Sequence, residues 1–188
     1  MKTKNLFSAL VLAVTVLASS ATFAQKGKTV MVGGATMYPT KNIIENAVNS
    51  KDHTTLVAAV KAAGLVETLQ SKGPFTVFAP TNEAFAKLPK GTVETLLKPE
   101  NLKTLQTILT YHVVAGKLSA ADLVKKIKAG KGKASLKTVA GGTLVASLKG
   151  KSVILTDEKG GTSKVTIANV NQSNGVIHVV DTVLLPKS

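Results

Sequence analysis

The chain carries three histidines, His53, His112 and His178, and imidazole is the side chain best suited to acid–base or metal chemistry near neutral pH. A metal site would need several of them to converge with carboxylates, in spacings such as His-x3-His or His-Glu-x2-His. The sequence contains neither spacing, and it has no cysteine to supply a thiolate ligand or a disulfide. We therefore expect no metal ion and no cofactor.

A hydrolase triad is the second chemistry to consider, because His178 and Asp181 are near neighbours and serines and threonines are plentiful. Side chains alternate between the two faces of a strand, so His178 and Asp181 are predicted to point in opposite directions. The sequence has no Gly-x-Ser-x-Gly turn, and Gly130–Lys133 lacks the frame of a phosphate-binding loop. His53 lies at the start of a predicted helix, where we expect it to be exposed. The sequence thus favours a protein that is not an enzyme.

His112 has a different setting, because it falls on the apolar face of the helix predicted after Pro99. A buried imidazole needs hydrogen-bond partners for its ring nitrogens. The side-chain amide of Asn82 offers both a donor and an acceptor. We predict that His112 reaches the turn formed by Pro80, Thr81 and Asn82, and that these residues form a structural network instead of a ligand site.

The turn itself is predicted from the stretch GPFTVFAPTNEAFAKLP, residues 73–89. Residues 75–79 are apolar in both alternating sets, which is typical of a strand that is covered on both faces. Pro80 disfavours helical geometry in the residue before it, and Thr81 or Asn82 is suited to cap the short helix that follows. We interpret this stretch as a corner of the scaffold.

The other predicted elements divide the chain into a helical first half and a strand-rich second half. Apolar periodicity predicts short helices within residues 42–48, 54–63, 65–69, 92–97 and 99–112. Ser119 and Asp122 resemble the capping box of a further helix. Alternating residues predict strands over residues 137–140, 143–148, 151–156, 163–168 and 176–185. This order predicts an α+β fold, with one sheet or a small sandwich covered by short helices.

The N-terminus has the order of a secretory signal peptide, with Lys2 and Lys4 first, then an apolar stretch, then small residues ending at Ala24. The apolar stretch is shorter than the about 20 residues that a membrane span needs, and we expect no later span. We therefore divide the chain into a signal peptide (residues 1–24), an N-terminal arm (25–41) and one domain (42–188). We expect the protein to be secreted or periplasmic, without a cysteine for a lipid anchor.

The chain is strongly basic, with 24 lysines against 10 acidic residues and no arginine. Arginine and stacking aromatic residues dominate nucleic-acid recognition, so we expect no nucleic-acid partner. No acidic residue lies between Asp122 and Asp157, where lysines are concentrated. They include Lys125, Lys126, Lys128, Lys131, Lys133 and Lys137. This segment is either a solvated face that keeps the protein soluble or a contact for acidic polysaccharide or anionic lipid.

Three stretches resemble the signature segments of the fasciclin domain family. They are TVFAPTNEAF (residues 76–85), TYHVVAGKL (110–118) and NGVIHVVDTVLLP (174–186), and they occur in the order of the family. The resemblance extends from about Ile43 to Pro186. It implies a wedge-shaped antiparallel β-sandwich with a cluster of short helices, in a family of extracellular adhesion modules that is not known for catalysis.

The resemblance also implies two functions. In animal members a Tyr-His pair is implicated in integrin binding, and the matching residues here are Tyr111 and His112. This implies attachment to a cell-surface or matrix protein, and the lysine-rich segment adds acidic polysaccharide as a partner. Some family members carry carotenoids on an apolar surface. The alternative function is therefore a carrier of an apolar small ligand such as a carotenoid or a lipid.

Overall fold

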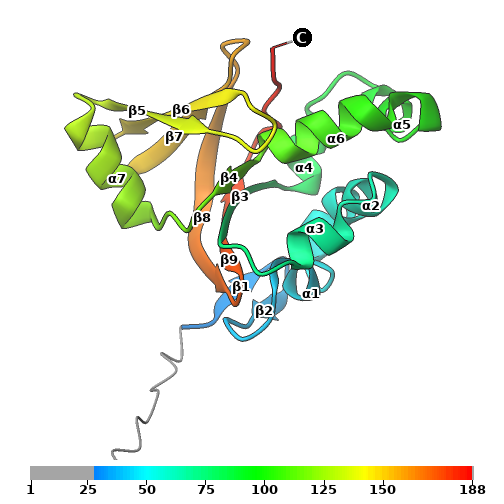
Figure 1. Ribbon diagram of the computed structural model, residues 1–188, viewed down its shortest axis with the longest axis horizontal. Coiled ribbons are helices and arrows are strands. Elements are labelled where there is room, and N and C mark those ends of the chain that lie inside the picture. Colours follow the sequence, from blue (N-terminus) through cyan, green and yellow to red (C-terminus); the bar gives the residue numbers. More distant parts are fainter. Residues whose placement is uncertain (1–27, 188) are drawn as a thin grey trace, which may run out of the picture.

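The computed structural model describes residues 28–187 as a seven-stranded sheet, a separate two-stranded hairpin and a set of short helices (Figure 1). The predicted signal peptide lies outside the described residues. The strands are β1 (Val30–Val32), β2 (Ala35–Met37), β3 (Phe75–Pro80), β4 (Val113–Ala115), β5 (Lys133–Lys137), β6 (Thr143–Lys149), β7 (Ser152–Thr156), β8 (Thr162–Gln172) and β9 (Gly175–Val180). The α-helices are α1 (Ile43–Ala47), α2 (Thr54–Ala62), α3 (Val66–Gln70), α4 (Asn82–Ala86), α5 (Thr92–Leu96), α6 (Leu102–Tyr111) and α7 (Ala120–Ala129), and short 3-10 turns cover Lys51–His53 and Pro99–Asn101.

The large sheet has the strand order β4-β3-β9-β8-β7-β6-β5. A bridge between Val114 and Thr138 joins its two ends, so the sheet nearly closes on itself. The predicted α+β class with a cluster of short helices is confirmed. The sheet is not purely antiparallel, however, because β3 and β9 run parallel. A parallel pair needs a long crossover connection, and all the elements from α4 to β8 lie between these two strands in the chain.

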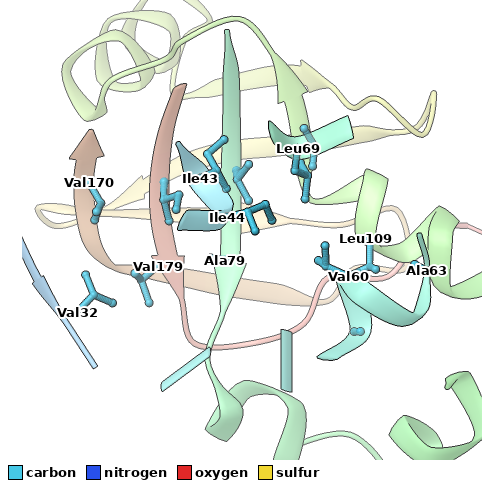
Figure 2. Packing of buried hydrophobic residues seen from close by; sticks show 14 of the residues in the cluster. Val32, Ile43, Ile44, Val60, Ala63, Leu69, Ala79, Leu109, Val170 and Val179 are labelled. Atoms are coloured by element: carbon cyan, nitrogen blue, oxygen red, sulfur yellow. The ribbon is translucent and has the colours of Figure 1, made fainter. Parts of the chain in front are cut away.

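Strand β3 separates two cores, as its two-sided apolar pattern predicted. Val77 and Ala79 belong to the core beneath the helices, whereas Phe78 belongs to the core enclosed by α7 and the strands β5 to β8. Figure 2 shows the first core, where side chains of α1, α2, α3 and α6 meet those of β3, β8 and β9. Strand β3 therefore lies at the centre of the molecule, with helices on one side and the closed part of the sheet on the other (Figure 1).

The strand that was predicted over residues 137–140 lies earlier in the chain, at β5 (Lys133–Lys137). Its burial alternates, with Ala134 and Leu136 inside and the residues between them exposed. The outward positions include two lysines, and the inward ones are only alanine and leucine, so the apolar signal of this strand is weak. The capping box was predicted correctly, because Ser119 and Asp122 bind each other's backbone N–H groups at the start of α7.

The described part of the N-terminal arm is built into the domain. Strands β1 and β2 form a hairpin whose Val32 and Met37 are buried in the first core. The side-chain amide of Asn46 accepts a hydrogen bond from the Tyr38 N–H at 2.9 Å and donates one to the Tyr38 carbonyl at 2.8 Å. Strands of three residues carry too little alternation to be predicted, and this hairpin was therefore found only in the structure.

Candidate functional site

His112 is buried where helix α6 ends, and both of its ring nitrogens have backbone partners. The backbone N–H of His112 binds the Leu109 carbonyl, which leaves the Ile108 carbonyl free for imidazole Nδ1 at 2.8 Å. Nε2 lies 3.0 Å from the backbone nitrogen of Leu184. Because Leu184 N–H is a donor, Nε2 accepts and Nδ1 carries the proton. Burial lowers the pKa of His112 to about 4, and the Ile108 carbonyl and Asp157 oppose this effect only in part.

The predicted link between His112 and the turn at Asn82 is wrong, since both nitrogens of the ring are already engaged. Thr81 caps helix α4 with its hydroxyl. Asn82 donates to the Lys51 carbonyl at 2.8 Å and accepts from the Thr55 N–H at 3.0 Å. Asn82 thus connects α4 to the start of α2, and His112 connects α6 to the C-terminal segment, so the residues form two separate structural joints.

Tyr111 and His112 do not form a surface for a direct adhesion contact, because their side chains are 0% and 2% exposed. The Tyr111 hydroxyl donates to the Thr143 carbonyl at 2.8 Å and accepts from the Glu158 N–H at 3.2 Å. Burial raises the pKa of Tyr111 to about 12. The expectation of a partner contact at this pair is therefore corrected: the face of α6 that carries it points inward, and the tyrosine holds α6 against two distant segments.

His178 is a further buried joint. Its ring stacks on Phe78 with the ring centroids 5.7 Å apart, and Nε2 donates to the Leu118 carbonyl at 2.8 Å. Nδ1 accepts from the backbone N–H of Asn169, within the irregular register of β8. Asp181 instead binds the Lys164 N–H. His178 and Asp181 thus have separate partners, as the alternation of the strand predicted, and they form no catalytic pair.

His53 was expected to be exposed, but only 3% of its surface is accessible. Its Nδ1 lies 2.8 Å from the Ser50 hydroxyl oxygen, and this hydroxyl has no other hydrogen-bond partner within residues 28–187. Nε2 is buried and has no hydrogen-bond partner in the described part of the chain. Burial lowers the pKa of His53. The Ala79 carbonyl is near enough to oppose this effect in part, although it does not form a hydrogen bond with Nε2.

His53 lines a cavity of about 80 Å³ between the helices and the sheet. The wall is almost entirely apolar and comes from α1, α2, α3, α6 and the sheet, in the core drawn in Figure 2. Ser50 and His112 also lie in the wall. The sequence pattern did not reveal this site. The only signal was the Ser-x-x-His spacing from Ser50 to His53, which is common at the start of helices and says nothing of burial.

The six lysines predicted as a polyanion contact, Lys125, Lys126, Lys128, Lys131, Lys133 and Lys137, are all exposed, and we call them the lysine surface. They lie on α7, on β5 and on the turn between the two elements, which pack against each other. Lys126 and Lys137 line one hollow of about 340 Å³, together with Ser135 and Thr138. In Figure 1, α7 and β5 lie on one side of strands β3 and β9, and helices α2 and α3 lie on the other side.

Within residues 28–187, no group of three or more histidine, cysteine, aspartate or glutamate side chains is arranged to hold a metal ion. No helix in this range is long and apolar enough to cross a membrane.

A nearly closed sheet, a layer of short helices and an apolar cavity between them define the chain as a small α+β domain in which His112 and His178 are structural joints. Similarity to known proteins identifies the family to which the chain belongs. The model of the fasciclin domain matches residues 51–186. The chain belongs to the fasciclin domain family, and the resemblance seen in its three signature stretches is confirmed.

Individual relatives agree with this assignment. The protein sll1483 of Synechocystis is 48% identical over 163 residues, which cover 85% of this chain and 81% of that protein. The immunogenic protein MPB70 of Mycobacterium bovis is 37% identical over 145 residues, which cover 74% of this chain and 66% of that protein. Among solved structures, a FAS1 domain pair from the insect cell adhesion molecule Fasciclin I matches with a TM-score of 0.70 at 19% identity. This match covers 79% of the chain and 52% of the insect chain, and it shows the fold alone.

Proposed function

We propose that this chain is a non-catalytic adhesion module that acts outside the cytoplasm and attaches to an acidic polysaccharide of the cell envelope or matrix through the lysine surface. The N-terminal pattern of the sequence supports the location. Membership of the fasciclin domain family, whose members are chiefly extracellular adhesion modules, supports the role. The buried Tyr111 and His112 contribute to the scaffold that holds α6 in place, and the partner contact is assigned elsewhere.

The observation that carries this proposal is the arrangement of charge on α7 and β5. Six exposed lysines come together on two adjacent elements and the turn between them, and no acidic residue lies in the chain between Asp122 and Asp157. Strand β5 places Lys133 and Lys137 on its outward face because Ala134 and Leu136 occupy the inward one. The strand and the helix thus fix the backbone positions of several lysines along one face, and a spread array of cations suits a repeating anionic polymer better than a compact ligand.

The attraction is expected to be modest and sensitive to salt. An exposed ion pair contributes about 0.2–1 kcal/mol, and charges are screened over about 10 Å at an ionic strength of 0.1 M. Three such contacts together contribute about 0.6–3 kcal/mol, which corresponds to about a 3- to 100-fold change in affinity. Attachment then requires many contacts along one polymer chain.

The test compares two triple variants with equal net charge on heparin and alginate columns at low salt. The first variant removes three cations of the lysine surface: Lys126→Gln, Lys133→Gln and Lys137→Gln. The control removes three exposed lysines elsewhere: Lys90→Gln, Lys98→Gln and Lys103→Gln. We expect the first variant to elute at clearly lower salt than the wild type, and the control to stay close to it. Equal losses in both variants, or no retention of the wild type, would refute the proposed contact.

A further inference from the structure

The cavity beneath α2 contains a buried polar atom that no residue of the described chain satisfies. The Ser50 hydroxyl can donate only one hydrogen, and the Nδ1 atom of His53 is the only partner found for it within residues 28–187. In the tautomer that leaves the hydroxyl hydrogen paired, Ser50 donates to Nδ1 and the proton of the neutral ring lies on Nε2. This Nε2–H is a buried donor without an acceptor. Native structures rarely leave such a group unpaired without a ligand or a water to bind it.

We propose that this cavity binds a slender, neutral, apolar small molecule with one hydrogen-bond acceptor, and that His53 Nε2–H donates to that acceptor. The inference goes beyond the proposed attachment to polysaccharide, because the cavity and the lysine surface lie on opposite sides of β3 and β9 (Figure 1). For the alternative function, a carrier of an apolar small ligand, the inference also specifies the chemical class of that ligand.

The composition of the wall favours a neutral ligand over a charged one. Away from Lys61 and Thr68, the wall contains the polar residues Ser50, His53, Thr110 and His112, and otherwise consists of apolar side chains such as Ile44, Val60 and Val77. Both nitrogens of His112 are occupied, and burial lowers the pKa of His53, which favours the neutral ring. A carboxylate beside His53 would have no cation near it, because Lys61 lies at the other end of α2, and this is costly in an apolar environment. A ketone, aldehyde or alcohol oxygen would need only the single donor that His53 supplies.

The shape of the cavity favours an alkyl chain. His53 precedes the first residue of α2, and Lys61 lies near its other end, about 12 Å away for eight residues of helix. At that end the wall includes the exposed residues Lys61, Thr68 and Val139, which place the entrance there. A cavity of about 150 Å³ admits benzene, so the volume of about 80 Å³ here admits only a ligand smaller than benzene, such as a chain of about three carbons. The ligand would enter with its polar end first and place its chain along α2.

The experiment uses the full chain and three probes with the same chain length: propanone, propane and propanoate. Binding is followed by NMR titration of the backbone amides and of the His53 ring nitrogens. We expect propanone to shift the Nε2–H resonance and to bind about three- to tenfold more tightly than propane, the contribution of one hydrogen bond. Propanoate is expected to bind more weakly than propanone. The substitution His53→Phe keeps a ring of similar size without the donor, and it should abolish the preference for the ketone while propane still binds.

A second pair of variants keeps the test independent of His53 and of its effect on folding. Ala47 lies in the cavity wall, whereas Ala58 is exposed on α2 outside it. We expect Ala47→Leu to fill the cavity and weaken binding of propanone at least tenfold, and Ala58→Leu to leave it unchanged. The proposal would be overturned by any of three results: no perturbation of the cavity residues, equal affinity for the three probes, or an intact ketone preference in His53→Phe. A resonance of Nε2–H that no probe moves would assign the site to a buried water.

Discussion

Protonation of His112 is expected to destabilise the protein as the pH falls below neutral. The ordinary pKa of histidine is 6.5, and burial lowers that of His112 to about 4 in the folded protein. The unfolded chain therefore takes up the proton first, so the stabilising contribution is complete above pH 6.5 and is lost as the pH falls toward 4. The structure gives the reason, because a proton on Nε2 would face the Leu184 N–H, which already needs this nitrogen as its acceptor.

The magnitude follows from these two pKa values. Between pH 7 and pH 5 the free energy of unfolding should fall by about 2 kcal/mol through His112 alone. His53 and His178 are also buried with lowered pKa values, so the wild-type protein should lose more than this. A loss of this size is a substantial fraction of the about 5–15 kcal/mol that stabilises a typical domain.

The assay is urea unfolding at pH 7 and pH 5 and at constant ionic strength, with two variants. His112→Gln removes the titrating group, and we expect the difference in unfolding free energy between the two pH values to shrink by about 2 kcal/mol. Ile108→Val alters a buried neighbour without removing a titrating group. It should cost about 0.5–1.5 kcal/mol at both pH values and leave the pH dependence intact. If His112→Gln keeps the full pH dependence of the wild type, the reasoning about His112 is refuted.

The other predictions concern the remaining joints. Tyr111→Phe should lower the free energy of unfolding by about 1–3 kcal/mol, because two buried hydrogen bonds are lost, while retention on the heparin column stays that of the wild type. A change in retention without a change in stability would instead indicate that Tyr111 contributes to the contact with the polysaccharide. Asn82→Ala should cost about 1–2 kcal/mol in thermal or urea unfolding, because the Lys51 carbonyl and the Thr55 N–H lose their partner. The exposed neighbour Glu83→Ala is its control, and equal effects of the two substitutions would argue against this joint.

Several elements were predictable because their signals are short-range. The two-sided apolar pattern of residues 75–79 predicted a strand between two layers, and β3 does separate two cores. The spacing of Ser119 and Asp122 predicted the start of α7, since a capping box is closed by residues within one helical turn. The apolar face of α6 predicted that His112 is buried, which it is. In each case the pattern that carries the prediction lies within a few neighbouring residues.

The partners of the buried polar groups were not predictable in this way. His112 binds Leu184, which is 72 residues away, and the choice of Leu184 over Asn82 depends on how the C-terminal segment passes the end of α6. Any acceptor of suitable geometry would have satisfied the sequence argument. The burial of His53 has the same origin, because a residue at the start of a helix is exposed unless another layer covers it. The β1–β2 hairpin and helix α1 lie beside this position, and the hairpin belongs to a part of the chain with little pattern.

The sequence by itself thus determined the family, the α+β class, the excess of lysine between α7 and β7, and the absence of the residue spacings that metal and hydrolase chemistry need. These are properties of composition and of local periodicity, which do not depend on long-range contacts. Only the tertiary structure decided that Tyr111 faces inward, that His112 binds Leu184, that six lysines share one surface, and that His53 presents an unpaired N–H to an apolar cavity. Such features arise where distant segments pack together, and the energy of that packing depends on several segments at once, so no single stretch of the chain predicts it.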